Sequence, residues 1–262
     1  MNILLEPSRR LVIGHRGNRA HAPENTIESF AQAVAAGADA IEFDVHLSAD
    51  GIPVVHHDPT LTRTTDGTGE IARMNFADLR KVDAGARFTK DGKTFPYRGA
   101  GHRIPRFGEV LEAFPAIPLL VEIKDPLAAT EVRRIIEQHK STERVVVDSF
   151  RSEALRVFDG SGIATGASRN GIARMLREGL GAGEAGQVEF KVLCTPLSYY
   201  GVPIPITRII AAARKHDVRV NVWTVNETDV AQRLWLAGVT GIISDDPGSM
   251  IALRKQLEAH GF

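Results

Sequence analysis

Cysteine is almost absent from this sequence, because Cys194 is the only one among 262 residues. A single cysteine cannot form an intramolecular disulfide, and it excludes a zinc site built from several cysteines. We therefore expect Cys194 to be a core residue. Long hydrophobic runs are lacking as well, since the apolar run at residues 3–5 is too short for a signal peptide or a membrane span. These absences favour a cytoplasmic protein without a stable membrane anchor.

An excess of charge of either sign is also lacking. The 32 Lys and Arg residues are balanced by 32 Asp and Glu residues, so no overall basic field would attract nucleic acid, and we expect no nucleic-acid partner. A net charge near zero gives no indication of the oligomeric state. Apolar residues make up 43% of the chain, which indicates a globular protein with a sizeable core. The length fits one domain over residues 1–262.

Short apolar segments alternate with helical periodicity along the whole chain. The main strands are predicted at 11–14, 40–45, 118–123, 144–147, 163–167, 190–194, 218–223 and 240–243. Helices are predicted at 26–36, from about 106, and at 127–139, 152–158, 171–180, 207–216, 227–237 and 248–258. This alternation indicates an α/β protein with a parallel sheet, either open and doubly wound or closed into a TIM (β/α)8 barrel. The count of eight strands favours the barrel, and the lack of a GxGxxG motif after the first strand argues against a dinucleotide-binding fold.

The first helix carries signals for its start and its end. Asn25, followed three residues later by Glu28, resembles a capping box, and Gly37 follows the last residue of the periodic segment. We therefore expect Asn25 to cap the helix over 26–36.

Residues 59–105 interrupt the alternation, after a short returning strand at 53–55. A connection of this length is usually functional or contains structure of its own. The spacing of Phe76, Leu79 and Val82 predicts a short helix within it. We expect a small insertion after the second strand that lies over the mouth of the barrel. The alternative is an excursion that packs on the side.

Acidic residues share one face of the second strand. Alternation places Glu42 and Asp44 on the same face, and the turn at 48–51 brings His57 back toward them. A half-exposed strand with a solvated acidic face is the alternative. In a barrel, the carboxyl ends of all strands meet at one face. The other polar or aromatic residues at predicted strand ends are His15, Arg16, Glu122, Lys124, Trp223 and Asp245.

Together these side chains indicate phosphodiester cleavage. The repulsion among Glu42, Asp44 and Glu122 is tolerable only if they share a proton, face cations or bind a metal, and an all-oxygen set suits Mg²⁺ or Ca²⁺. Arg16 and Lys124 would hold an anion such as phosphate. The two histidines would transfer protons near neutral pH. Taken singly, each group has a structural alternative, such as a hydrogen-bonded histidine or a salt bridge at the rim.

The sequence resembles the glycerophosphodiester phosphodiesterase family over nearly its whole length. The matching runs are HRG at 15–17, PENT at 23–26, EFDV at 42–45, DG at 50–51 with VV at 54–55, HDP at 57–59, LTRTT at 61–65, EIK at 122–124, SF at 149–150, VWTVN at 222–226 and GIISDDP at 241–247. Their ordered succession is strongly specific. Ser244 stands where Thr is more usual in this family, a change that touches no catalytic position.

The resemblance implies a barrel hydrolase that converts glycerophosphodiesters, which are deacylated phospholipids, to glycerol 3-phosphate and an alcohol. It implies a cyclic phosphate, formed when the glycerol 2-hydroxyl attacks phosphorus and opened by water. The residues that it implies are the metal ligands Glu42, Asp44 and Glu122, the acid/base pair His15 and His57, the substrate-binding residues Arg16, Lys124 and Trp223, and the supporting residues Glu24, Asn25 and Asp245. A divalent ion, Mg²⁺ or Ca²⁺, is the expected cofactor and a small diester the expected partner.

Two alternatives to this function remain. Related barrels share the core, so a lysophospholipase D acting on lysophospholipids is one, and it would want an apolar rim built from aromatic residues such as Phe88, Phe95, Tyr97, Tyr199 and Tyr200. A non-catalytic barrel that binds a phosphorylated ligand is the other. The loss of a histidine or a carboxylate would be its signature, and none is lost.

The remaining histidines near these motifs are expected outside the reaction. His46 lies one step beyond Asp44 on the same strand face and is expected at the rim. His56 points away from His57 and is expected to be structural, and His21 is near the site in sequence only.

Overall fold

Eight parallel strands form a nearly closed barrel in the computed structural model, which describes residues 2–7 and 9–261. The barrel strands are β1 (Leu11–His15), β2 (Ala40–Leu47), β4 (Leu119–Ile123), β5 (Val145–Asp148), β6 (Ala164–Thr165), β7 (Val192–Pro196), β10 (Arg219–Trp223) and β11 (Gly241–Ser244). Their order is β6-β5-β4-β2-β1-β11-β10-β7, and a parallel bridge between Gly166 and Val192 brings the two outer strands together. The predicted TIM barrel is therefore confirmed, and the open doubly wound sheet is excluded.

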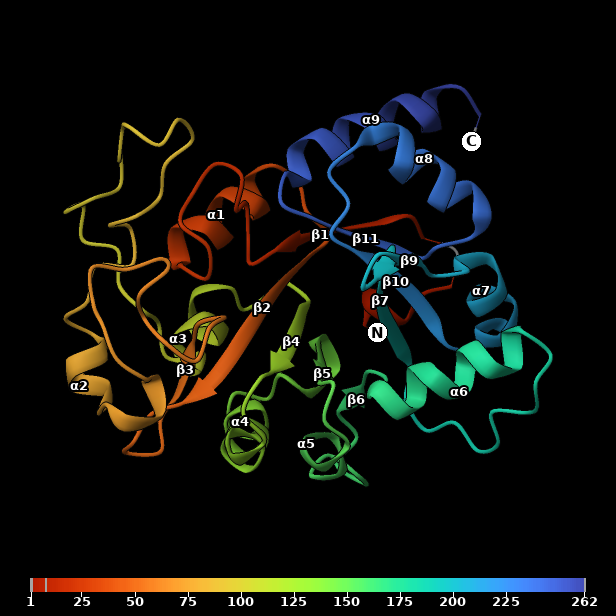
Figure 1. Cartoon of the computed structure of the whole chain (residues 1–262), viewed down its shortest axis with the longest axis horizontal. Coiled ribbons are helices and arrows are strands. Elements are labelled where there is room, and N and C mark those ends of the chain that lie inside the picture. The colour runs from red at the N-terminus through yellow and green to blue at the C-terminus, as the bar shows by residue number, and fades with distance from the viewer. Residues whose placement is uncertain (1, 8, 262) are drawn as a thin grey trace.

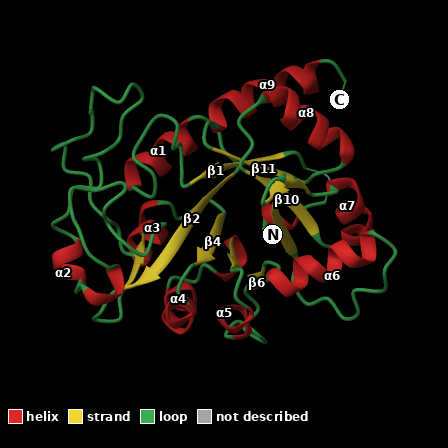
Figure 2. Cartoon of the chain, in the orientation of Figure 1, coloured by secondary structure: helices red, strands yellow, loops and turns green. Residues whose placement is uncertain are grey.

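Helices surround the strands on the outside (Figures 1 and 2). They are α1 (Ile27–Ala35), α3 (Phe107–Ala113), α4 (Ala129–Gln138), α5 (Ser152–Arg156), α6 (Arg169–Gly179), α7 (Ile206–Lys215), α8 (Thr228–Ala237) and α9 (Pro247–Ala259). Short 3-10 turns are η1 (Ile3–Leu5), η2 (Ile71–Arg73), η3 (Pro126–Ala128) and η4 (Thr142–Arg144). No helix within the described part of the chain is both long and apolar enough to cross a membrane. Met1 and Phe262, the ends of the predicted domain, and Ser8 lie outside the described residues.

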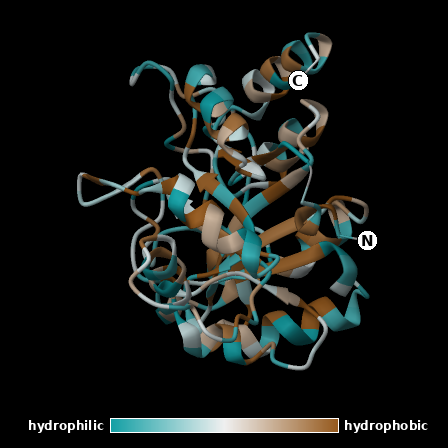
Figure 3. Ribbon diagram, turned by 90° about the vertical axis from the view of Figure 1, so that its right-hand side faces the viewer, coloured by the Kyte–Doolittle hydropathy of each residue, from teal (hydrophilic) through white to brown (hydrophobic). Residues whose placement is uncertain are grey.

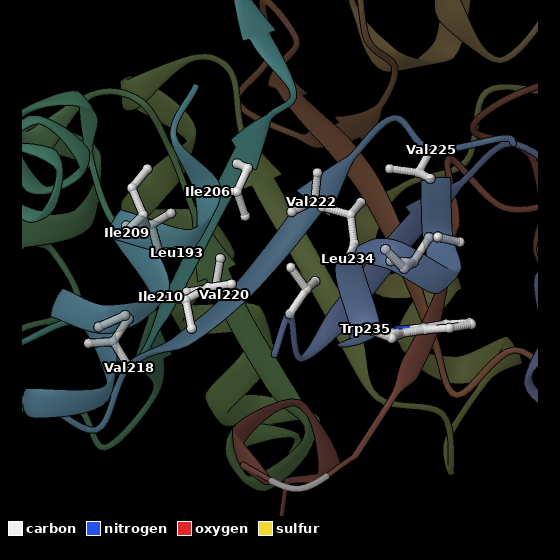
Figure 4. Packing of buried hydrophobic residues seen from close by; sticks show 14 of the residues in the cluster. Leu193, Ile206, Ile209, Ile210, Val218, Val220, Val222, Val225, Leu234 and Trp235 are labelled. Atoms are coloured by element: carbon white, nitrogen blue, oxygen red, sulfur yellow. The ribbon is translucent and has the colours of Figure 1, made fainter. Parts of the chain in front are cut away.

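The main core lies between the strands and the ring of helices. Figure 3 shows hydrophobic strands at the centre and more polar helices around them. In one half, strand residues such as Val220 and Val222 pack against Ile209 of α7 and Trp235 of α8 (Figure 4). The outward residues of the strands are thus buried under amphipathic helices, which explains why both the strands and the helices were recognisable in the sequence.

The barrel lumen changes from apolar to polar along the strands. Toward the strand starts, Leu11 and Ile13 pack with Leu4 of η1, which is buried at this end of the barrel. Further along the same strand faces, the lumen becomes polar. His15 lies two positions after Ile13 in β1, Glu42 lies two positions after Ala40 in β2, and both line a pocket. The lumen therefore opens at the carboxyl ends of the strands, where the active sites of such barrels lie.

The first helix is capped by Thr26, so the prediction of an Asn25 cap is wrong. The Thr26 side chain accepts a hydrogen bond from the Ser29 N–H. Asn25 instead has a left-handed backbone with φ of 59°, whereas a capping residue needs an extended one. Its side-chain amide donates to Asp44 at 2.9 Å. Asn25 therefore serves the site rather than the helix, and Gly37 ends the helix as predicted, with φ of 93°.

Residues 59–105 lie beside the barrel, outside the ring of helices (Figure 1, left). β3 (Pro53–Val55) pairs antiparallel with β2, and α2 (Phe76–Leu79) is shorter than the predicted helix. Tyr97 contacts Gln32 of α1, and Arg80 pairs with Glu109 of α3. Among the described residues, none of 59–105 lines the central pocket. The structure thus favours the side-packed alternative over a cover on the mouth.

The differences from the sequence prediction include two shortened elements and one hairpin. β6 contains two residues where five were predicted, and α5 ends at Arg156 because a turn follows, in which the Phe158 N–H donates to the Leu155 carbonyl. The hairpin of β8 (Ser198–Tyr199) and β9 (Val202–Pro203) was not predicted. It follows β7 and therefore lies on the face of the barrel where the pocket opens.

Candidate active site

Strand register brings three carboxylates together at the pocket. Asp44 of β2 lies in register with Glu122 of β4, and Glu42 lies two residues earlier on the same face of β2. Oxygen atoms of all three lie within 4.8 Å of one another, and we call this set the carboxylate cluster. Glu42 is 6% exposed and Asp44 is 1% exposed. The alternative of a solvated acidic face is therefore wrong.

The donor set of the carboxylate cluster fits a divalent cation. Oxygens at these separations can surround one ion, because metal–oxygen distances are about 2.0–2.1 Å for Mg²⁺ and about 2.3–2.6 Å for Ca²⁺. Burial raises the pKa of Glu42, and the charges of Asp44 and Glu122 raise it further. Burial also raises the pKa of Glu122. A positive ion among these buried oxygens would favour their charged forms.

Two cationic side chains flank the carboxylate cluster. Lys124 Nζ lies 3.0 Å from Asp44 Oδ1 and 2.7 Å from Glu122 Oε2. Arg16 Nε lies 3.2 Å from Asp44 Oδ2 but finds no hydrogen-bond partner in the described chain, so this contact is an ion pair without hydrogen-bond geometry. Burial alone would raise the pKa of Asp44, yet Lys124 and Arg16 hold it below its usual range.

Each of the two predicted catalytic histidines is held by an aspartate. His15 Nδ1 lies 2.6 Å from Asp245 Oδ1, and His57 Nδ1 lies 2.6 Å from Asp58 Oδ1. Both rings line the central pocket. Because Nδ1 is engaged in each case, Nε2 is the nitrogen that remains for proton transfer.

The environment of His57 favours its neutral form. Burial lowers the pKa of His57, and the charges of Lys124 and Arg16 lower it further. Asp44 and Asp58 act in the opposite direction without reversing the shift. A neutral imidazole can accept a proton, so His57 suits the role of a base near neutral pH.

An ion-pair network centred on the Glu24 side chain connects the two histidine–aspartate pairs. Glu24 accepts hydrogen bonds from Arg16 at 2.7 Å, from Arg19 at 3.0 Å and from Arg63 at 2.7 and 2.9 Å. Arg63 also donates to Asp58 at 2.6 Å. Arg19 reaches Asp245 at 3.4 Å. Glu24, at 9% side-chain exposure, is thus the common partner of three arginines, and they hold its pKa far below its usual value although burial opposes this.

The central pocket has a volume of about 70 Å³. Its lining comprises His15, Arg16, Glu42, His57, Leu120, Glu122, Lys124, Asp148, Phe150, Cys194, Trp223 and Ile243. Phe150 and Trp223 meet edge to face with ring centroids 6.3 Å apart. Every predicted catalytic, metal-binding and substrate-binding residue is therefore at this pocket, except that Asp44 lies buried just behind it within the carboxylate cluster.

Several site residues were not assigned from the sequence. Asp58 and Arg63 lie within the motifs that match the family, but the sequence analysis assigned them no role. An aspartate directly after a histidine is a signal that could have identified Asp58 as the partner of His57. Asp148 and Phe150 were missed as well. Burial, with Glu122 next in effect, raises the pKa of Asp148 to about 7. Cys194 is buried, as predicted, and forms part of the lumen core.

The remaining histidines lie outside the pocket lining. His46 Nε2 lies 2.9 Å from the backbone carbonyl of His57, so it fixes the segment that carries His57 and is more than a rim residue. His56 Nε2 lies 3.2 Å from the Thr60 carbonyl and is structural, as predicted. His21 contacts Asp246 rather than any residue of the pocket.

Comparison with known proteins agrees with this arrangement. A model of the glycerophosphoryl diester phosphodiesterase family matches residues 15–249. The chain is 34% identical over 255 residues to a glycerophosphodiester phosphodiesterase of Caldanaerobacter subterraneus, which covers 95% of this chain and 99% of that protein.

Two solved structures that are described as phosphodiesterases share this architecture. A putative glycerophosphoryl diester phosphodiesterase from Silicibacter pomeroyi superposes with a TM-score of 0.77 at 30% identity, covering 96% of this chain and 95% of that one. A phosphodiesterase from Oleispira antarctica, solved in complex with sn-glycerol-3-phosphate, superposes with a TM-score of 0.77 at 26% identity, covering 94% and 97%.

Proposed function

Because the chain belongs to the glycerophosphoryl diester phosphodiesterase family, we propose that it hydrolyses glycerophosphodiesters to glycerol 3-phosphate and an alcohol with the help of a divalent cation. The observation that carries the proposal is the buried carboxylate cluster in one pocket with two aspartate-held histidines. The relative solved with sn-glycerol-3-phosphate supports the identity of the product. The relatives named as enzymes argue against the alternative of a non-catalytic barrel.

Glu42, Asp44 and Glu122 would hold the cation, and their oxygen donors suit Mg²⁺ or Ca²⁺. When bound, such a cation supplies acidification of the attacking hydroxyl and offsets charge on the phosphoryl oxygens. Arg16 and Lys124 lie beside the cluster and would bind the phosphate oxygens. Arg16 and Lys124 would then be shared between the phosphate and the carboxylates that they contact.

The two histidines would carry out the proton transfers. One accepts the proton of the glycerol 2-hydroxyl while its oxygen forms a bond to phosphorus, and the other protonates the head-group oxygen as its bond to phosphorus breaks. Water then opens the resulting cyclic phosphate with the two roles reversed, so both imidazoles return to their starting states. The lowered pKa of His57 suits the accepting role in the first step. Trp223 and Phe150 would provide the apolar wall beside the substrate.

A panel of glycerophosphodiesters tests the proposal. Glycerophosphocholine, glycerophosphoethanolamine and glycerophosphoglycerol are assayed for release of glycerol 3-phosphate after EDTA treatment and after addition of Mg²⁺ or Ca²⁺. We expect release that depends on added cation, and the absence of release under every condition would overturn the activity. A His57→Ala variant should still bind the cation but lose turnover, and an undiminished rate would remove the acid/base role.

One observation favours lysophospholipase D activity as a second candidate. In the β8–β9 hairpin, Tyr200 is 90% exposed and packs against Tyr199, with Val202 also exposed. These side chains lie on the face where the pocket opens and would form an apolar rim. By contrast, Phe88 and Tyr97 pack against each other. Turnover of a lysophospholipid at a rate matching that of glycerophosphocholine would support this candidate.

The cellular location, metabolic role and partner of the protein are predictions. We propose a cytoplasmic enzyme of glycerol and lipid metabolism whose partner is a small diester rather than nucleic acid. Measuring activity in the cytoplasmic and membrane fractions of the source cells tests the location, and recovery of the activity in the membrane fraction would contradict it.

A further inference from the structure

A fourth carboxyl group, that of Asp148, lies next to the carboxylate cluster. Asp148 ends β5 in register with Glu122 of β4, which is itself in register with Asp44 of β2. Residues in register on neighbouring parallel strands point to the same face, so the Asp148 side chain faces the lumen. Among the described residues, the cluster comprises only Glu42, Asp44 and Glu122. Asp148 is therefore a neighbour of the predicted cation site and not one of its ligands.

A glycine and a backbone amide fix the place of this carboxyl group. A methyl group added to Gly166 would overlap Asp148 Oδ1, so the absence of a side chain there makes room for the carboxyl. Gly166 is not among the glycines with positive φ, so its backbone conformation does not itself require glycine. The Ser149 N–H donates to Asp148 Oδ1 at 3.0 Å. These contacts hold the carboxyl group in one orientation.

Asp148 lines the pocket together with charged residues, such as Glu122 and Lys124, and with apolar ones. Leu120, Ile243 and Trp223 line the same pocket, and the Cys194 thiol is a further polar neighbour of the carboxyl. The Ser149 N–H and the Cys194 thiol already bond to this carboxyl group, and its two oxygens keep acceptor sites for a further hydrogen-bond partner. A hydroxyl group of a ligand would be such a partner, since a hydroxyl can donate to a carboxylate and can accept from a carboxylic acid.

The size of the pocket indicates which part of a diester fits beside Asp148. Its volume of about 70 Å³ is several times the roughly 10–15 Å³ that one water needs. This is the scale of a three-carbon polyol and not of an acyl chain. In a series of glycerophosphodiesters the head group varies in size while the glycerol moiety does not. Because the proposed function places the 2-hydroxyl at the carboxylate cluster, the glycerol moiety would lie inside the pocket beside Asp148, and the head group would extend toward the open mouth.

We propose that Asp148 binds the terminal hydroxyl of the glycerol moiety, the one not adjacent to the phosphate-bearing carbon, and thereby selects unacylated glycerol. The inference rests on the proposed function, because it takes the 2-hydroxyl to lie at the carboxylate cluster. In a lysophospholipid acylated at the terminal position, that hydroxyl is an ester. It can no longer donate to Asp148, and its chain exceeds the volume of the pocket.

A pair of substrates tests the role of Asp148. Glycerophosphocholine is compared with the diester in which 1,2-propanediol replaces glycerol, which keeps the hydroxyl next to the phosphate-bearing carbon and lacks only the terminal one. A hydrogen bond to a charged group predicts a preference in kcat/KM of about tenfold or more for glycerophosphocholine in the unaltered enzyme. In Asp148→Ala the preference should fall to about onefold, because only glycerophosphocholine loses an interaction. Turnover of the propanediol diester then serves as the control for folding.

Two further variants and one control sharpen the test. Asp148→Asn keeps an acceptor for the Ser149 N–H and should restore part of the preference. Gly166→Ala should displace the carboxyl and reduce the preference without altering Asp148 itself. Asp159→Ala, at an exposed carboxylate, should leave the preference unchanged.

The outcomes separate this inference from the proposed function. Equal kcat/KM for the two diesters in the unaltered enzyme, or the same preference in Asp148→Ala, overturns the role of Asp148 and leaves the proposed function standing. Failure of the unaltered enzyme to hydrolyse either diester with any cation overturns both.

Discussion

Arg63 and Glu24 form a two-pronged ion pair, with Nη1–Oε2 at 2.9 Å and Nη2–Oε1 at 2.7 Å. Arg63 also donates a hydrogen bond at 2.6 Å to Asp58, the partner of His57. The orientation of His57 is therefore tied to a carboxylate 33 positions away in sequence. Because Glu24 also binds Arg19, which reaches the aspartate that holds the other histidine, both imidazoles depend on this one side chain.

Glu24→Gln should lower turnover while leaving the carboxylate cluster in place. The substitution removes the negative charge shared by Arg16, Arg19 and Arg63 and frees them to reorient. Loss of a group that orients site residues costs about 10- to 100-fold in activity, and we expect the loss in kcat more than in KM. Steady-state kinetics on glycerophosphocholine measures it. Glu28→Gln is the matched control, at a glutamate of α1 that accepts a hydrogen bond from Gln32 and is not part of this network. An unchanged kcat in Glu24→Gln would contradict the dependence on this network.

Asp58→Asn should shift the acidic limb of the pH profile to lower pH. Burial lowers the pKa of His57, so protonation of this base sets a limb on the acid side of its usual value of about 6.5. The carboxylate of Asp58 raises the pKa of His57, so its neutralisation lowers that pKa further, and the base stays neutral down to a lower pH. The pH dependence of kcat/KM measures the shift. A limb that moves to higher pH would contradict this assignment.

Glu122→Gln should weaken binding of the cation without loss of the fold. The substitution keeps the size of the side chain and removes one of three charged oxygen donors. Because the affinity of an oxygen site depends on ligand charge, we expect affinity for Mg²⁺ or Ca²⁺ to fall by about 100-fold or more. Calorimetric titration of the EDTA-treated protein measures it. Glu131→Gln, at the exposed Glu131–Arg134 pair of α4, is the control. Equal affinities in all three proteins would contradict a site at the carboxylate cluster.

The barrel could be predicted from the sequence because its strands and the helices around them carry local patterns. The outward faces of strands and the inward faces of helices are continuously apolar, so element types and order were readable without tertiary information. β6 was overestimated, because only two of its residues pair as a strand. The β8–β9 hairpin was missed because its Tyr199–Tyr200 pair is exposed and has no alternating pattern over such short strands.

The site was predictable to the extent that strand ends specify it. Glu42, Asp44 and Glu122 meet because parallel strands end at one face, a rule that needs no coordinates. Glu24 was expected as a supporting residue, but its partner Arg63 was not readable, because their bond depends on how residues 59–105 pack. Asp148 was missed because its significance depends on strand register and on the space left by Gly166.

The stability of the site region should depend on the aromatic core behind it. Phe43 lies between Glu42 and Asp44 in sequence, so its side chain points to the opposite face of β2, where its ring centroid is 5.4 Å from that of Phe30 and 6.1 Å from that of Phe107. Phe43→Ala would leave a cavity among buried rings and should lower the free energy of unfolding by about 3–5 kcal/mol. Urea denaturation followed by circular dichroism measures the change.

Leu127→Ala provides the comparison, because Leu127 is 78% exposed and its truncation should change the free energy of unfolding by about 0.5 kcal/mol or less. The two variants remove apolar atoms of similar kind from opposite environments, so their difference isolates the contribution of burial. A loss below about 1 kcal/mol in Phe43→Ala would mean that the helices can close over the missing ring. In that case β2 would owe its position to its hydrogen-bonded neighbours β1 and β4 and not to the aromatic core.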